Sequence, residues 1–153
     1  MKRNISLYLR LLAMIYAGTA LGILWFWYQF FTGALFSLEE LRPLIANFDG
    51  YYDWEKSFLL PDSILAAGML ISAARLWMAR GRDQGRILAA MCAGAALFLG
   101  VLDLNYGFST GLYEIAHSYG EEVLGSGISI TVVGLVAVAI LSAGPADAGV
   151  KHS

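Results

Sequence analysis

The chain has very few of the side chains on which redox and metal chemistry depends. Its 153 residues include one cysteine, Cys92, and two histidines, His117 and His152. A single thiol cannot build a disulfide, a CxxC redox pair or a thiolate zinc site within one chain. A haem held by two histidines inside a helical bundle is not expected either, because His152 lies in the polar C-terminal tail. We therefore expect no bound cofactor.

Charged residues are also scarce, at 14% of the chain against 58% hydrophobic residues. This balance is too apolar for an ordinary soluble domain and predicts a protein embedded in membrane lipids. The sequence has no phosphate-binding G-x-x-x-x-G-K-[ST] loop, no H-E-x-x-H and no G-x-S-x-G motif. Its basic residues do not alternate with aromatics on one face, so we expect no nucleic-acid partner.

Four apolar runs are long enough to cross a bilayer, which takes about 20 helical residues for roughly 30 Å of hydrocarbon. They cover residues 5–31, 58–79, 87–106 and 124–142. The first run follows two basic residues, as a signal peptide does, but it is too long for a signal core and lacks an A-x-A cleavage site. We predict one all-α domain, residues 1–153, that forms a four-transmembrane-helix bundle with longer connections at 36–57 and 107–123.

The distribution of charge predicts an orientation. Most basic residues fall on one side of the four predicted spans, and the opposite side keeps only Arg42 and Lys56 among many acids. By the positive-inside rule both termini are cytoplasmic and the two longer connections lie outside. We expect an integral protein of the inner (plasma) membrane of a bacterium. The basic residues on the cytoplasmic side are Lys2, Arg3, Arg10, Arg75, Arg80, Arg82, Arg86 and Lys151.

Small residues recur at helical spacing in the spans. Gly18 and Gly22 form a G-x-x-x-G pair, Gly68 and Ser72 a similar pair, and the third span carries alanines and Gly100. Such residues let helix backbones approach closely in lipid, so we expect them at helix contacts. They leave open whether one of these faces makes a homodimer or joins a larger membrane complex.

Two acids lie inside the apolar runs. Asp62 follows Pro61 near the start of the second span, for which Ser57 is the predicted N-cap, and Asp103 lies near the outer end of the third. Each has a simple structural explanation: the helix dipole favours an acid near an N-terminus, and Asp103 can end its helix at interfacial water. However, charged side chains at membrane depth are costly and often mark a site.

Convergence of these two acids on one pocket is the functional hypothesis. Paired carboxyls can share a proton, bind a cation or hold a cationic ligand. Asp62 and Asp103 are therefore the candidate catalytic residues. The candidate ligand-binding residues are Asp62, Asp103, Trp54, Asn105, Tyr106 and Trp27.

The stretch TGLYEIAHSYGEEVLG, residues 110–125, predicts a short amphipathic outer helix before the fourth span. Glu114 and His117 are spaced as an E-x-x-H pair, and Glu121 lies one turn further on. A di-iron bundle needs a second such pair, which the chain lacks. We favour a solvated interfacial helix, with a divalent-metal site or a pH sensor at these residues as the alternative.

The stretch Trp54-Glu55-Lys56-Ser57-Phe58-Leu59-Leu60-Pro61-Asp62 resembles the W-x-K-S-F-L-x-x-[DE] start of the second span in EXPERA proteins. This group contains emopamil-binding sterol isomerases and sigma-two-type receptors. The resemblance implies a four-helix membrane protein that holds a sterol-like or cationic amphiphilic ligand against buried acids, with Asp62 as the second-span acid. The first span departs from the receptor branch, because it offers Tyr28, Gln29 and Thr32 where that branch has an acid.

Four functions remain open from the sequence. The first is binding of an apolar or cationic amphiphilic ligand in an outer-leaflet pocket lined by acids and aromatics. The second is isomerisation of a lipid-soluble substrate by paired carboxyls. The others are an accessory subunit of a larger complex and a small dimeric transporter, although the spans lack the Gly/Pro breaks of a midplane transport site.

Overall fold

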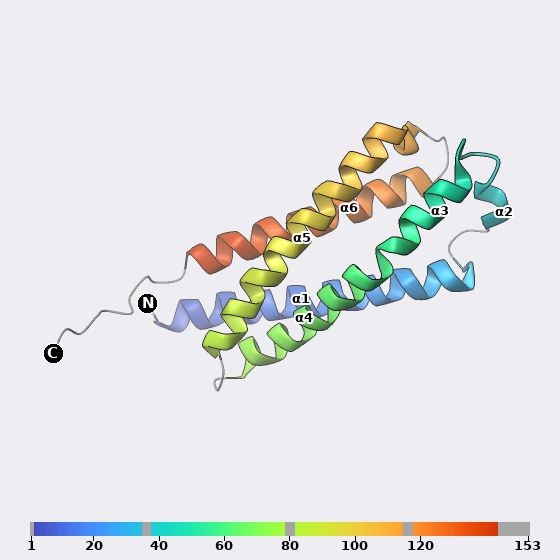
Figure 1. The fold of residues 1–153 in the computed structure, drawn as a ribbon. Helices are drawn as coiled ribbons and strands as arrows, with labels where there is room; N and C mark the ends of the chain where they lie inside the picture. The colour runs from blue at the N-terminus through green and yellow to red at the C-terminus, as the bar shows by residue number, and fades with distance from the viewer. Residues whose placement is uncertain (1, 35–37, 79–81, 115–117, 144–153) are drawn as a thin grey trace.

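The computed structural model describes residues 2–34, 38–78, 82–114 and 118–143 (Figure 1). These ranges are mainly helical and contain no strand, which confirms the predicted all-α class. The elements in chain order are α1 (Lys2–Thr32), α2 (Leu38–Leu41), α3 (Phe48–Ser57), α4 (Leu59–Trp77), α5 (Arg82–Thr110), the 3-10 turn η1 (Leu112–Glu114) and α6 (Ser118–Ser142).

Four segments of the described chain are long and apolar enough to cross a membrane, as predicted. They are Leu7–Thr32, Phe48–Trp77, Arg82–Thr110 and Val123–Ser142. The N-terminal ends of α1 and α5 and the C-terminal ends of α4 and α6 lie at one end of the molecule, and α2 and η1 lie at the other (Figure 1). We call the α2 and η1 end the distal end. Which side of a membrane it faces remains the prediction from charge.

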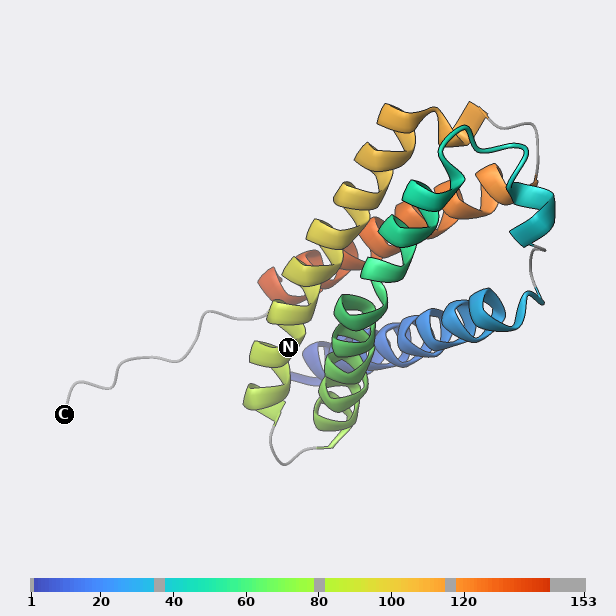
Figure 2. The same ribbon diagram turned by 45° about the vertical axis from the view of Figure 1, so that its right-hand side comes forward.

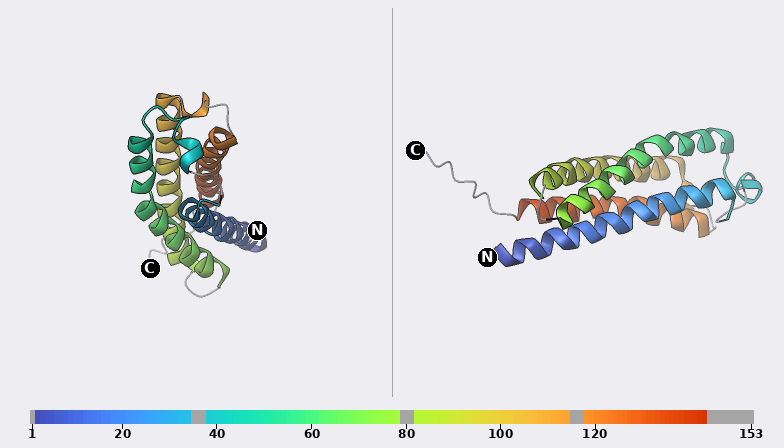
Figure 3. Two further views of the ribbon diagram at one scale, coloured as in Figure 1. Left: turned by 90° about the vertical axis from the view of Figure 1, so that its right-hand side faces the viewer. Right: turned by 90° about the horizontal axis from the view of Figure 1, so that it is seen from below.

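The long helices pack in a definite order. α4 lies between α1 and α5, and α6 runs along α5 (Figures 2 and 3). α1 and α6 also touch, but they pack together over a shorter stretch than the other neighbouring pairs of long helices do. The seam between α1 and α6 is therefore the loosest side of the assembly.

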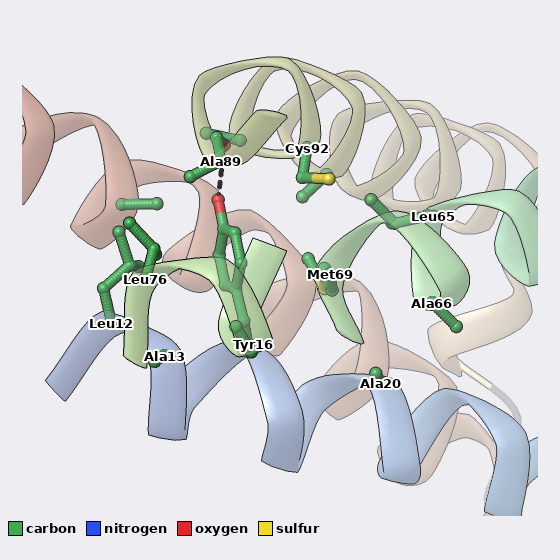
Figure 4. Close-up of a cluster of buried hydrophobic side chains, with 14 of the residues drawn as sticks. Leu12, Ala13, Tyr16, Ala20, Leu65, Ala66, Met69, Leu76, Ala89 and Cys92 are labelled. Atoms are coloured by element: carbon green, nitrogen blue, oxygen red, sulfur yellow. Dashed lines mark hydrogen bonds between the residues drawn. The ribbon is translucent and has the colours of Figure 1, made fainter. Parts of the chain in front are cut away.

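The tightest packing lies away from the distal end. Leu12, Tyr16, Met69 and Leu76 are fully buried there, and Cys92 lies beside them (Figure 4). The Tyr16 hydroxyl donates a hydrogen bond of 2.7 Å to the backbone carbonyl of Ala89. This bond satisfies a polar group that would otherwise be costly to bury.

Small residues mediate much of this packing. The Ser72 hydroxyl donates to the Gly85 carbonyl at 3.1 Å, and a Cβ at Gly68 would lie 2.9 Å from the Cys92 sulfur. Gly18 and Gly22 of α1 make no such contact within the described chain, because both are exposed and a Cβ at either position would meet nothing within 4 Å. A contact of this face with another chain remains a prediction. Spacing alone identifies a face that permits close approach, but it does not identify the partner.

The start of the second span also differs from the prediction. Ser57 is not an N-cap: it ends α3, and its hydroxyl donates to the Trp54 carbonyl at 2.6 Å. Phe58 stays in the right-handed helical region, and its carbonyl accepts from the Asp62 amide at 2.9 Å. The predicted outer connection at 36–57 therefore contains a helix that continues almost directly into α4, and Pro61 marks the break because it cannot donate to the preceding turn.

The second outer segment is shorter than predicted. α5 continues to Thr110 and ends at Gly111, whose φ of 69° favours glycine. Among the described residues, the predicted separate helix over 110–125 is replaced by the end of α5, η1 and the first turns of α6. A second apolar cluster covers this distal end; its buried members are Leu41, Phe48, Tyr51, Leu112 and Val123.

Candidate functional site

A cavity of about 270 Å³ lies between the long helices below the distal cluster. This volume lies just below the range of about 300–1,000 Å³ that is typical of ligand pockets, so the cavity accepts a small ligand or one end of a longer one. Its walls come from α1, α3, α4, α5 and α6. The lining residues are Thr19, Gly22, Ile23, Phe26, Glu55, Phe58, Asp62, Leu99, Gly100, Asp103, Ser126, Gly127, Ser129, Ile130 and Val133.

Among the described residues, three carboxyl groups and no basic side chain line this cavity. Glu55 comes from α3 and exposes only 8% of its surface, while Asp62 from α4 and Asp103 from α5 are half-buried. The three groups are close enough for their charges to interact. Within the described residues, the Glu55 and Asp103 carboxyls have no hydrogen-bond or ion-pair partner. Buried acids without partners are costly, which makes this arrangement unusual for a purely structural core.

The basic residues near the distal end are engaged elsewhere. Arg42 pairs with Asp49 at 3.4 Å, and Lys56 pairs with Asp53 at 2.9 Å. Both acids in these pairs are exposed. The carboxyls of the cavity therefore lack a counter-ion from the described part of the chain.

Asp62 is held by an aromatic residue of α1. The Trp27 indole N–H donates to the Asp62 Oδ2 at 3.1 Å, and the Trp27 ring is buried. Trp27 lies five residues before the end of α1, which is about 7.5 Å along the helix axis. The α1–α4 contact thus fixes the Asp62 carboxyl well below the distal end of the helices.

Asp103 lies against a glycine of α6. A Cβ at Gly127 would be 2.8 Å from the Asp103 Oδ2 and 3.1 Å from the Leu104 side chain. Because glycine has no such atom, α6 can approach α5 closely at this level. The contact also sets the register of the two antiparallel helices around the cavity.

Aromatic side chains separate the cavity from the distal end. Trp54 of α3 stacks on Tyr106 of α5, with ring centroids 4.2 Å apart and an interplanar angle of 11°. The Tyr113 ring packs directly against Gly107, and its hydroxyl donates to the Asp103 carbonyl at 3.3 Å. Burial and the nearby charges of Asp103 and Glu55 raise the pKa of Tyr113 to about 12. Tyr113 is therefore a neutral hydrogen-bond donor near neutral pH.

The structure brings most of the candidate residues from the sequence to one place. Asp62 and Asp103 line the same cavity, and Trp27 contacts it through Asp62. Trp54 and Tyr106 stack next to it without lining it. Asn105 is exposed on α5 and takes no part in the cavity wall.

Glu55 is the acid that the sequence prediction missed. It was assigned to an outer connection, whereas it lies on a helix that enters the bundle. A signal was present: Glu55 and Asp62 are seven residues apart, a spacing of two helical turns that places both on one face if the helix continues.

The structure does not test the alternative metal site at Glu114, His117 and Glu121. Glu114 is exposed on η1, His117 lies outside the described residues, and the side chain of Glu121 does as well. Among the side chains that are described, no group of three His, Cys, Asp or Glu is placed to hold a metal ion. Metal binding at this segment remains a prediction.

Comparison of the chain with protein-family profiles, with curated proteins and with solved structures gave no match. The functional argument therefore rests on the chemistry of the cavity.

Proposed function

We propose that this protein binds a cationic amphiphile, with the positive group of the ligand placed among Glu55, Asp62 and Asp103. The observation that carries the proposal is that three acids from three different helices line one cavity, within segments long and apolar enough to span a membrane, and have no basic partner among the described residues. A cation supplied by the ligand would offset the cost of keeping these carboxyls out of water. Attraction between unlike charges is also stronger there than at a wet surface.

The side on which the cavity is open favours a ligand that comes from the lipid. On the α1 and α6 walls, Gly22, Ser126 and Ser129 are exposed, whereas the acids on the opposite walls are buried or half-buried. These exposed residues lie within the segments that can span a membrane. An opening at the α1–α6 seam would therefore face acyl chains, and a ligand with an apolar tail could leave that tail in the bilayer.

The remaining wall of the cavity suits such a tail. Ile23, Leu99, Ile130 and Val133 provide apolar surface next to the acids. Burial of a tail against these side chains would contribute about 0.8 kcal/mol per CH₂ relative to water, although a tail already in lipid gains much less. The acids would therefore select for a positively charged head group, and the apolar wall would accept hydrocarbon tails of different structure.

Two sequence predictions are consistent with this proposal and remain predictions. The charge bias would place the distal end and its cavity in the outer leaflet of a bacterial inner membrane. The resemblance to EXPERA proteins would make Asp62 part of an acid-lined ligand pocket.

Isomerisation is the second candidate function. Its support is that the carboxyls have different surroundings: Asp62 accepts from Trp27, while the Asp103 carboxyl has no described donor. Two acids in different environments can divide the roles of proton donor and acceptor. An accessory subunit or a dimeric transporter has no comparable observation behind it.

A melting-shift experiment in lipid nanodiscs tests the binding proposal. We expect N,N-dimethyloctylamine, a cation at neutral pH, to raise the unfolding midpoint by about 5–10 °C at saturating concentration, since a ligand at about 100 times its Kd adds roughly 2.7 kcal/mol. The uncharged N,N-dimethyloctanamide should give almost no shift.

Asp62→Asn should reduce the shift with the amine while the protein remains folded, because the asparagine oxygen can still accept from Trp27. Glu40→Gln is the matched control, since Glu40 is an exposed acid on α2. Equal shifts with amine and amide, or a full shift in Asp62→Asn, would count against the proposal.

A further inference from the structure

One hydroxyl in the cavity wall, that of Ser129, has no hydrogen-bond partner among the described residues. Most of the serines and threonines described in the spans donate to a backbone carbonyl, usually three or four residues earlier. Within that part of the chain, only Ser129 and Ser142, the last residue of α6, lack any hydrogen bond. The side chains that are bonded are Thr19, Thr32, Ser57, Ser63, Ser72, Ser109, Thr110, Ser126 and Thr131.

Ser129 lies on the cavity face of α6. Ser126 lies three and four residues before Ser129 and Ile130, and these lie four and three residues before Val133; all four line the cavity and share one side of the helix. A hydroxyl among acyl chains or apolar walls normally bonds to its own helix, because leaving it unpaired is costly. Its neighbour Ser126 does so, with its hydroxyl 2.8 Å from the Val123 carbonyl.

The position of Ser129 relative to the acids follows from the α5–α6 register. Gly127 lies against the Asp103 carboxyl, and Ser129 is two residues further along α6, about 3 Å along the axis and about 200° around it, so the two residues flank the cavity face of α6. The three acids come from α3, α4 and α5, whereas Ser129 comes from the wall on α6. A ligand between these walls would meet carboxyls on one side and a free hydroxyl on the other.

We propose that Ser129 makes the second polar contact of the bound ligand, so that the preferred ligand is an amphiphilic amine carrying a hydroxyl or carbonyl oxygen a few bonds from its nitrogen. This inference rests on the proposed function. The proposed function requires only a positive charge on the ligand, whereas a contact with Ser129 would also select for an oxygen near the amine. The serine hydroxyl can both donate to and accept from such a group.

The test uses two amines that differ by one hydroxyl, N,N-dimethyloctylamine and its β-hydroxylated analogue, with affinities measured in lipid nanodiscs. We expect the wild-type protein to bind the hydroxylated amine about fivefold more tightly, the size of effect that one neutral hydrogen bond gives. Ser129→Ala should abolish this preference and leave the affinity for the plain amine unchanged. Ser126→Ala, which removes a hydroxyl that is already bonded, should keep the preference.

The outcomes separate the inference from the proposed function. Equal affinity of the wild-type protein for the two amines, or a preference that survives in Ser129→Ala, overturns the role of Ser129 and leaves the cation site intact. If neither amine binds to the wild-type protein, the cation site itself is wrong and the inference falls with it. Melting curves without ligand establish that both alanine variants fold.

Discussion

Glu55→Gln should weaken binding of N,N-dimethyloctylamine by about 30-fold, or roughly 2 kcal/mol, more than any other single neutralisation in the cavity. Glu55 is the most buried of the three acids, so its charge is the least screened by water and salt. Asp62→Asn and Asp103→Asn should each cost about tenfold, or ~1.4 kcal/mol. Isothermal titration in nanodiscs gives this rank order directly.

Glu55→Gln also shows whether Glu55 serves ligand binding or the stability of the fold. Three carboxyls in one cavity repel one another, so removing one charge should leave the unfolding midpoint of the ligand-free protein unchanged or higher. Glu40→Gln removes one charge from the exposed face of α2 and should change neither affinity nor midpoint. A Glu55→Gln protein that is destabilised but binds amine normally would show that Glu55 serves the fold.

Gly22→Leu should abolish amine binding although all three acids remain. Gly22 lines the cavity on α1, and a Cβ there meets nothing within 4 Å, so the leucine side chain can grow into the cavity at the α1–α6 seam. Because helical leucines point back toward the preceding turn, the side chain should extend toward Thr19, another wall residue. We expect at least a 30-fold rise in Kd, about 2 kcal/mol, measured by the same titration.

Gly18→Leu is the matched control for this change. Gly18 lies one turn earlier on the same face of α1, also has free space around its Cα, and does not line the cavity. It should bind amine as the wild type does, and neither variant should lower the unfolding midpoint, because neither side chain meets an obstacle. Normal binding by Gly22→Leu would mean that ligands do not occupy the space beside α1.

The sequence predicted the parts of this fold that depend on long apolar runs. A membrane-spanning helix needs about 20 such residues, so the four spans were visible from composition. The stretch Phe48–Ser57 was not, because its glycine, acids and tyrosines resemble a connection. It becomes a helix because Phe48 and Tyr51 pack in the distal cluster, and packing overrode local propensity.

Part of the candidate site was also predictable from the sequence. Asp62 and Asp103 stand out because each interrupts an apolar run, and both line the cavity. Glu55 and Ser129 do not stand out: the first lies in a polar segment, and the second is an ordinary residue of a membrane helix. Their importance comes from what surrounds them, since one is buried without a counter-ion and the other has no hydrogen bond within the described chain. Whether a side chain has a counter-ion or a hydrogen-bond partner depends on tertiary structure, which the sequence pattern does not reveal.

Equilibrium binding of radiolabelled N,N-dimethyloctylamine to the wild-type protein in nanodiscs tests the central claim most directly. Because the three acids line one cavity, we expect the radiolabelled amine to saturate one site per chain. Other amphiphilic amines should displace the bound label, and N,N-dimethyloctanamide should not. Uptake that rises linearly with concentration and equals that of protein-free nanodiscs would contradict it.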